Sequence, residues 1–317
     1  MLFLRQCATM TAKGEIAVIL TQIALRSCRL QSFLREELSL SSTLVKRLKW
    51  KNALFVNGER SHTDRVLSPG DTVSVLIEEA ADGFPAEPME LHILYEDEYL
   101  IALDKPAGMA VHPSPSRNEG TLANGLLHYY RQSGQPCGIH PVCRLDRDTV
   151  GVVLLAKSSH IHAKFHKMHM EKSIGKTYHA VTFGCPEKES GVIDLPIKKV
   201  GGGSLLRVID GSGQRAVSEY RILAQRNEFS KLELHPITGR THQLRLHCLA
   251  SGFPILGDPQ YNTQESLLCS QKLGLQTQLL CAFELSFVHP ISEDRIVIRS
   301  AQDFCIPDKD GCTVPYA

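Results

Sequence analysis

The stretch RLDRDTVGVVLLAK, residues 144–157, joins a carboxylate between two arginines to an uninterrupted apolar run. The run VVLLA, residues 152–156, contains β-branched residues and leucine without alternation, which is typical of a strand buried on both faces. Asp146, between Arg144 and Arg147, is therefore expected in a loop that enters a central strand. Neighbouring guanidiniums should keep this carboxylate ionised. It is either part of a structural ion pair or a nucleophile.

The chain after this loop continues as one supersecondary unit. Ser158 and Ser159 can cap SHIHAKFHKMHMEK, which we expect to be a helix, and KTYHAVTFG, residues 176–184, is predicted to be another strand. With loop, strand, helix and strand in this order, Asp146 and Tyr178 are able to approach each other at an edge of the sheet. Histidines of the helix share a face, but no second His or Cys pair lies nearby, so we expect no zinc site.

A third segment, HPITGRTHQLRLHCLASGFPILGD, begins with a glycine-containing turn and continues as a predicted helix over THQLRLHCLA. Its polar side chains are concentrated in Arg240, Thr241, His242, Gln243 and Arg245, directly before an apolar stretch. Polar residues gathered in this way indicate a functional site or a buried network.

The N-terminal part of the chain has a different character. Two short segments with helical spacing, CRLQSFLREEL and SSTLVKRLKWKNA, precede the strand signals ALFVNGE, with a tight Asn-Gly hairpin turn, and VLSPGDTVSVLIEE. Lys46, Arg47 and Lys49 give the second helix a basic edge, which is either a solvated face or a contact with nucleic acid. The small, aperiodic stretch AADGFPAEP, residues 80–88, is expected to be a linker.

Composition restricts the class of protein and its compartment. With 317 residues and 43% hydrophobic residues, the chain can form two domains or one large domain with an appendage. Lys and Arg total 35 against 34 Asp and Glu, so a nucleic-acid partner would have to be held by a local basic patch. The ten cysteines are scattered without CxxC pairs, which favours reduced thiols and a cytoplasmic protein. The apolar run of residues 16–25 lacks a cleavage site and is too short to span a membrane.

Two groups of these segments resemble known protein families. Two short helices, the second basic, followed by VNG and a PGD-containing strand resemble the α-L RNA-binding module of a small-subunit ribosomal protein. The motifs LDKPAGMAVHP, RLDRDTVG, KTYHAV, GRTHQLRLH and FPILGDPQY, spread over residues 91–300, resemble the RluA-type pseudouridine synthases. Two residues depart from the pattern of this family. Cys143 stands directly before RLD, where His is familiar, and Val150 replaces the small hydroxyl residue of DTSG.

The resemblance implies an α+β protein whose central sheet is mixed and mainly antiparallel with flanking helices, preceded by a small α/β RNA-binding module. The expected plan is an N-terminal extension (1–28), the α-L-like module (29–79), the linker (80–88), the catalytic domain (89–305) and a tail (306–317).

The resemblance also implies an activity. The protein would be an isomerase that converts specific uridines of structured RNA to pseudouridine after flipping the base out. Ribosomal RNA is favoured over transfer RNA as the substrate, and neither a cofactor, a metal nor a membrane is required. The protein is expected to be a monomer.

The resemblance assigns roles to particular residues. Asp146 is the catalytic carboxylate, which attacks the anomeric carbon or the uracil ring; Tyr178 stacks on the base and helps remove its proton; Arg245 pairs with Asp146 and helps fill the gap left by the base. The residues expected to contact RNA are Arg144, Lys46, Arg47, Lys49, Lys105, Arg240 and His242.

Two other functions compete with this one. A non-catalytic RNA-binding or ribosome-assembly factor could use the same fold, although such a relative would be expected to lose the Asp, Tyr or Arg. A carboxylate-dependent hydrolase needs a second acid at a defined separation, and Asp148 is only two residues from Asp146. The segments GGGS and GSGQ do not have the spacing of a nucleotide-binding loop and are expected to be hairpin turns.

Overall fold

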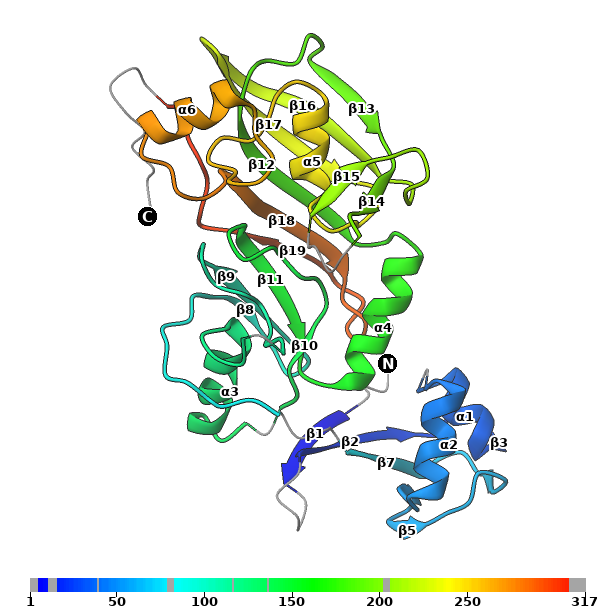
Figure 1. Cartoon of the computed structure of the whole chain (residues 1–317). Coiled ribbons are helices and arrows are strands. Elements are labelled where there is room, and N and C mark those ends of the chain that lie inside the picture. Colours follow the sequence, from blue (N-terminus) through cyan, green and yellow to red (C-terminus); the bar gives the residue numbers. More distant parts are fainter. Residues whose placement is uncertain are drawn as a thin grey trace.

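The computed structural model describes residues 5–10, 16–38, 40–78, 83–115, 117–135, 137–201 and 206–307, with side chains from Ala17 onward. Two units are visible in Figure 1, a small N-terminal one in blue and a larger one that contains the long sheet. The predicted C-terminal tail, apart from Ile306 and Pro307, lies outside the described residues, as does most of the GGGS segment.

The small unit is a five-stranded antiparallel sheet with two helices. Its strand order is β1 (Arg5–Met10), β2 (Ile16–Ile23), β7 (Thr72–Glu78), β4 (Leu54–Val56) and β5 (Glu59–Arg60). The helices are α1 (Leu30–Glu36) and α2 (Ser42–Trp50), and a two-stranded ladder joins β3 (Cys28–Arg29) to β6 (Val66–Leu67). The predicted hairpin turn is present, because Asn57 and Gly58 have φ values of 54° and 83°, as a two-residue turn of this kind requires.

The expectation that residues 1–28 form a separate extension is wrong. Strand β2 pairs with β7 from Ala17 opposite Glu78 to Ile23 opposite Thr72, so this segment belongs to the sheet of the small unit. The apolar run of residues 16–25 contains this strand, and Ala17, Val18 and Leu20 are buried in the core of the unit. No helix in the described part of the chain is long and apolar enough to cross a membrane.

The large unit contains a ten-stranded sheet with flanking helices, and the sheet is mixed and mainly antiparallel, as the resemblance implies. Its main order is β13 (Ser190–Asp194), β16 (Val217–Arg226), β17 (Phe229–Pro236), β12 (Gly175–Phe183), β18 (Leu280–Val288), β11 (Val150–Ala156), β9 (Leu100–Lys105) and β8 (Ile93–Glu96). Strands β10 (His140–Pro141) and β19 (Arg295–Arg299) pair with β11 and β18, and β14 (Ile197–Lys199) and β15 (Arg207–Ile209) form a separate hairpin. The helices are α3 (Leu122–Gln132), α4 (Ser159–Met170), α5 (Gln243–Ala250) and α6 (Gln264–Lys272).

Strand β11 is buried on both faces, as its composition predicts. Val153 and Leu155 pack in the cluster that contains residues of α3, whereas Val152 and Leu154 pack with Ile161 of α4. This burial fixes the strand at the centre of the sheet, and therefore also fixes the position of the loop that carries Asp146.

The two halves of the sheet meet where β11 runs parallel to β18, with Val150 opposite Cys281 and Gly151 opposite Ala282. Every other strand pairing in the described part is antiparallel. Gly151 has φ 106°, and a Cβ atom there would lie 2.4 Å from the carbonyl oxygen of Ala282. Only glycine permits this close approach of two backbones, five residues after Asp146.

Candidate active site

Asp146 lies in the loop that precedes β11 and contacts an arginine from a distant helix. Nη1 of Arg245, on α5, donates a hydrogen bond of 3.1 Å to Oδ2 of Asp146. The Asp146 side chain remains 28% exposed, while that of Arg245 is only 6% exposed. The carboxylate is thus open to a ligand on one side and paired with a buried cation on the other.

A second carboxylate holds Arg245 in place. Nε and Nη2 of Arg245 donate to the two oxygens of Asp258 at 2.7 and 2.8 Å, and Nη2 also donates to Gln260 at 3.3 Å. Burial lowers the pKa of Arg245, but hydrogen bonds and charges from Asp258 and Asp146 raise it above the ordinary value. The two-pronged contact with Asp258 fixes the guanidinium plane and directs Nη1 toward Asp146.

The arginines beside Asp146 in the sequence are not its partners. Arg147 donates to Asp148 at 3.1 Å, and Arg144 is exposed. The cation that pairs with Asp146 therefore comes from Arg245, 99 residues later. The donors of Arg245 are engaged with protein acceptors in a buried position, and its expected part in filling the gap left by a flipped base stays a prediction.

His242 lies at the centre of the site and not on an outer RNA-binding surface. Its Nδ1 is 2.9 Å from the hydroxyl of Tyr261, and its Nε2 is 3.8 Å from Oδ2 of Asp146. Burial lowers the pKa of His242, and the charges of Arg245 and Arg207 lower it further, against the opposing effect of Asp146. His242 has φ 58° and precedes α5, so the helix begins at Gln243, two residues later than the predicted start. A non-glycine residue in this region stores strain, which is common at functional sites.

Tyr178 lies on β12 at an irregularity of the sheet. The register between β12 and β18 shifts between Thr177 and His179, and a bulge of this kind redirects the side chain it contains. Burial raises the pKa of Tyr178, and the negative charge of Asp146 raises it further. The phenol therefore keeps its proton at neutral pH and is within electrostatic range of Asp146.

Lys105 does not have the role that the sequence suggested. The side chain is fully buried at the end of β9, and Nζ donates to the carbonyl oxygens of Pro106, Met109 and Arg147 at 2.8, 2.9 and 2.8 Å. Burial lowers its pKa to about 8. The predicted phosphate contact is wrong, because the ammonium group is directed inward and fastens the loop after β9 to the loop that carries Asp146.

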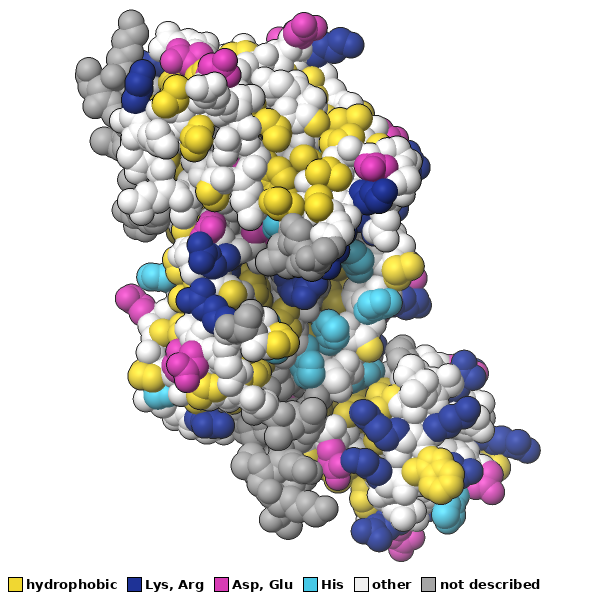
Figure 2. All heavy atoms as spheres, in the orientation of Figure 1, with side chains coloured by type: hydrophobic (Ala, Val, Ile, Leu, Met, Phe, Trp, Pro, Cys, Tyr) yellow, Lys and Arg dark blue, Asp and Glu magenta, His cyan; other side chains and the backbone are white. Residues whose placement is uncertain are grey.

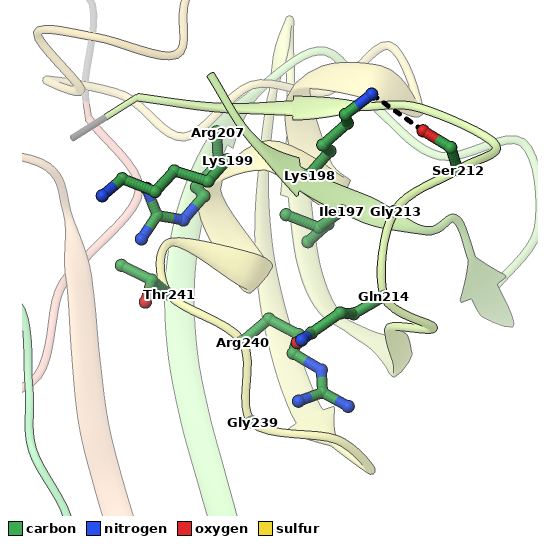
Figure 3. Close-up of a pocket in the computed structure, with 10 residues that line it drawn as sticks. All are labelled: Ile197, Lys198, Lys199, Arg207, Ser212, Gly213, Gln214, Gly239, Arg240 and Thr241. Carbon is green, nitrogen blue, oxygen red and sulfur yellow. Dashed lines mark hydrogen bonds between the residues drawn. The ribbon is translucent and has the colours of Figure 1, made fainter. Parts of the chain in front are cut away.

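An open pocket of about 430 Å³ lies beside this centre and contains Arg240. It is formed by the β14–β15 hairpin, the turn before β16 and the loop before α5 (Figure 3). Lys199 and Arg207 face each other across the hairpin, and Figure 3 shows both side chains extending past Thr241. Lys198 extends toward Ser212 and donates to it at 2.8 Å. The backbone N–H of Arg207 also donates to the hydroxyl of Tyr261, which links the hairpin to His242.

The remaining predicted RNA contacts, Lys46, Arg47 and Lys49, are exposed on α2. Figure 2 shows Lys and Arg side chains gathered over the small unit, and histidines and further Lys and Arg side chains on the surface of the large unit. Within the described residues, no group of three or more His, Cys, Asp or Glu is arranged to hold a metal ion.

The site also contains residues that sequence reasoning did not assign. Asp258, Gln260 and Tyr261 all come from FPILGDPQY, which stands out as a motif but gives no hint of which side chain each residue contacts. The burial of Asp258, whose side chain has no exposed surface, is a property of the folded chain.

Comparisons with known proteins identify the family of the chain. Residues 99–250 match the family described as RNA pseudouridylate synthase. An uncharacterized RNA pseudouridine synthase of Bacillus subtilis, YhcT, is 32% identical over 272 residues, which cover 85% of this chain and 88% of that protein. The chain belongs to the RNA pseudouridine synthase family. It is therefore an RNA isomerase, and the resemblance to the RluA-type branch is confirmed.

Other pseudouridine synthases extend the comparison. The ribosomal large subunit pseudouridine synthase C of Vibrio cholerae is 32% identical over 288 residues, 86% of this chain and 89% of that protein. Among solved structures, human RNA Pseudouridylate Synthase Domain Containing 4 has a TM-score of 0.54 at 26% identity, covering 69% of this chain and 89% of that one.

The role of Lys105 leads to a prediction about stability. Lys105→Met should lower the free energy of unfolding by about 3 kcal/mol, because three carbonyl groups lose a charged donor. Urea unfolding at neutral pH measures this change, with the exposed Lys188→Met as the matched control. Equal stability of the two variants would show that Lys105 does not fasten the loops.

The difference in unfolding free energy between wild type and Lys105→Met should depend on pH. Folding lowers the pKa of Lys105 to about 8, from a usual value of 10.5. Between these pH values the unfolded chain binds more protons at this residue, so stability conferred by the wild-type residue rises with pH. The difference in unfolding free energy between wild type and Lys105→Met should therefore grow in favour of wild type from pH 8 to pH 10. A constant difference would contradict the lowered pKa.

Proposed function

We propose that this enzyme isomerises uridine in RNA with Asp146 as the nucleophile. The observation that carries the proposal is the contact of Asp146 with Arg245, which is itself held by the buried Asp258. An anchored guanidinium favours the ionised carboxylate and fixes its orientation. The exposed side of the carboxylate is available for the nucleoside.

The reaction balances without an oxidant, a reductant or a cofactor. The glycosidic bond between N1 of uracil and the anomeric carbon breaks, the base turns, and a bond forms between the same carbon and C5. The proton on C5 is lost and N1 gains one. Asp146 forms its temporary bond either to the anomeric carbon or to the uracil ring, and both routes need an ionised carboxylate.

The target base has to leave its helix before Asp146 can reach the nucleoside, at a cost of a few kcal/mol. We assign the ring of Tyr178 to stacking on the extruded uracil, because it lies within electrostatic range of Asp146. The hydroxyl keeps its own proton, so in proton transfer it would act as a relay, accepting one proton while releasing another. Exposed Arg144, two residues before Asp146, contacts the RNA beside the vacated position.

The pocket beside the centre is suited to a phosphate of the substrate strand. Lys199 and Arg207 are directly opposite each other on the hairpin, and both line the pocket. A bound phosphate would make charge-assisted contacts with these two side chains. The link from the backbone of Arg207 through Tyr261 to His242 means that this phosphate would lie close to the reacting nucleotide.

We propose ribosomal RNA as the substrate and the cytoplasm as the compartment. We also propose that residues 29–79, together with β1 and β2, form an α-L-like RNA-binding module. The relative from Vibrio cholerae is named a ribosomal large subunit enzyme, which supports ribosomal RNA over transfer RNA. Mapping pseudouridines in all RNA of a strain that lacks the gene identifies the position. A lost modification in transfer RNA would overturn the choice of substrate.

The nucleophile assignment predicts the behaviour of two neighbouring variants. Asp146→Asn should reduce pseudouridine formation at least about 1,000-fold, because an amide keeps the shape but cannot attack. Asp148→Asn is the matched control and should stay within a few fold of wild type, since Asp148 pairs with Arg147. Pseudouridine is quantified by mass spectrometry of digested RNA, with the melting temperature recorded. Near wild-type turnover of a folded Asp146→Asn protein would show that Asp146 is not the nucleophile and contributes only to binding.

The phosphate assignment predicts a second pair of results. The double variant Lys199→Gln with Arg207→Gln should weaken RNA binding and reduce the dependence of log K on log salt by about 0.7 for each lost phosphate contact. Lys188→Gln, at an exposed lysine that does not line the pocket, is the control and should have a much smaller effect. Filter binding at several salt concentrations measures both. If the double variant and the control have equal slopes, the pocket does not bind the RNA backbone.

A further inference from the structure

Trp50, at the end of α2, is the largest exposed apolar side chain of the small unit. Its exposed fraction is 86%, compared with 68% for Leu25 and 62% for Val66 of the same unit. A single exposed apolar residue is ordinary on a protein surface. Trp50 differs because of the charges on the same helix.

Cations surround Trp50 along the helix. Lys46 and Arg47 precede it by four and three residues, so both lie one turn away on neighbouring positions of the helix surface, and Lys49 adjoins it. All three side chains are exposed. Figure 2 shows hydrophobic and Lys or Arg side chains intermixed on this face of the small unit. An aromatic ring among cations can hold a nucleobase by stacking while the cations hold its phosphates.

The apolar face of α2 argues against a membrane as the partner. Val45 and Leu48 are buried in the core of the small unit, with Leu44 packed against it. An interfacial helix inserts a continuous apolar face into the lipid, and here that face is already occupied by the protein. What remains exposed is one aromatic ring in a basic setting, which matches single-stranded RNA in charge and in chemistry.

We propose that Trp50 is a stacking platform for an unpaired nucleobase of the substrate RNA, with Lys46, Arg47 and Lys49 on the adjoining phosphates. This contact rests on the proposed RNA substrate and places an unpaired nucleotide at the small unit, away from the uridine that reacts at Asp146. The substrate would therefore contain two single-stranded elements, one for each unit.

The experiment uses the full-length protein and the fluorescence of its single tryptophan. The probes are a hairpin RNA whose stem is closed by a non-nucleotide linker and which carries a single-stranded tail, the same hairpin without the tail, and vesicles of phosphatidylcholine and phosphatidylglycerol. The tailed hairpin should quench the emission saturably, with the same midpoint as binding followed by anisotropy of labelled RNA. The hairpin without the tail should quench much less, and the vesicles should have no effect.

Three variants separate stacking from other contacts. Trp50→Leu should weaken binding of the tailed hairpin about 5- to 10-fold, because a base loses its aromatic partner. Trp50→Phe should retain most of the affinity, and Leu25→Ala, which removes another exposed apolar side chain of this unit, should bind as wild type does. Because binding is measured without turnover, failure of the stacking contact is distinguishable from failure of the nucleophile assignment.

Several results would overturn the proposal. Emission that does not change when anisotropy shows saturated RNA would place Trp50 away from the RNA. Equal quenching by the two hairpins would indicate proximity to a duplex backbone without stacking. A response to vesicles alone would identify a membrane contact. Equal RNA affinities of wild type and Trp50→Leu would show that Trp50 does not stack on the RNA and would point to a protein partner.

Discussion

The contact of Arg245 with two carboxylates is the constraint around which the site is built. Asp258 holds the guanidinium by two donors, and the remaining nitrogen reaches Asp146. Replacing buried ion pairs by apolar residues is often neutral or stabilising, so stability alone does not explain this arrangement. Its effect is on geometry, because it joins the loop before β11, helix α5 and the loop that follows α5 at one point.

The sheet supplies the rigidity that this contact requires. Gly151 allows β11 and β18 to approach at the junction of the two halves, and Lys105 ties the loop after β9 to the carbonyl of Arg147. Both residues fix the chain directly after Asp146, at Arg147 and at Gly151. His242, held in a left-handed conformation beside Tyr261, completes the surroundings of the carboxylate. The nucleophile thus lies on a loop whose neighbours are fixed.

Much of this organisation follows from local patterns in the sequence. The unbroken apolar run after Asp146 predicts a central strand, and β11 is one; the pairing of Arg245 with Asp146 follows from a family resemblance and is present. The contacts of Asp258 and Lys105 could not be predicted, because full burial of a charged side chain is rare and depends on partners that only the folded chain brings together. The place of strand β2 in the sheet could not be predicted, because nothing in this apolar run indicates that it pairs with β7.

The Asp258→Asn variant tests whether the anchored arginine positions Asp146. Its neutral side chain no longer fixes Arg245, so kcat for pseudouridine formation should fall about 100-fold while KM for RNA changes little. Gln260→Ala, which removes only the longer contact of 3.3 Å with Arg245, serves as the control and should retain most activity. Circular dichroism at the assay temperature verifies that both variants are folded. A folded Asp258→Asn enzyme with the kcat of wild type would contradict the claim that the anchored arginine positions Asp146 for the reaction.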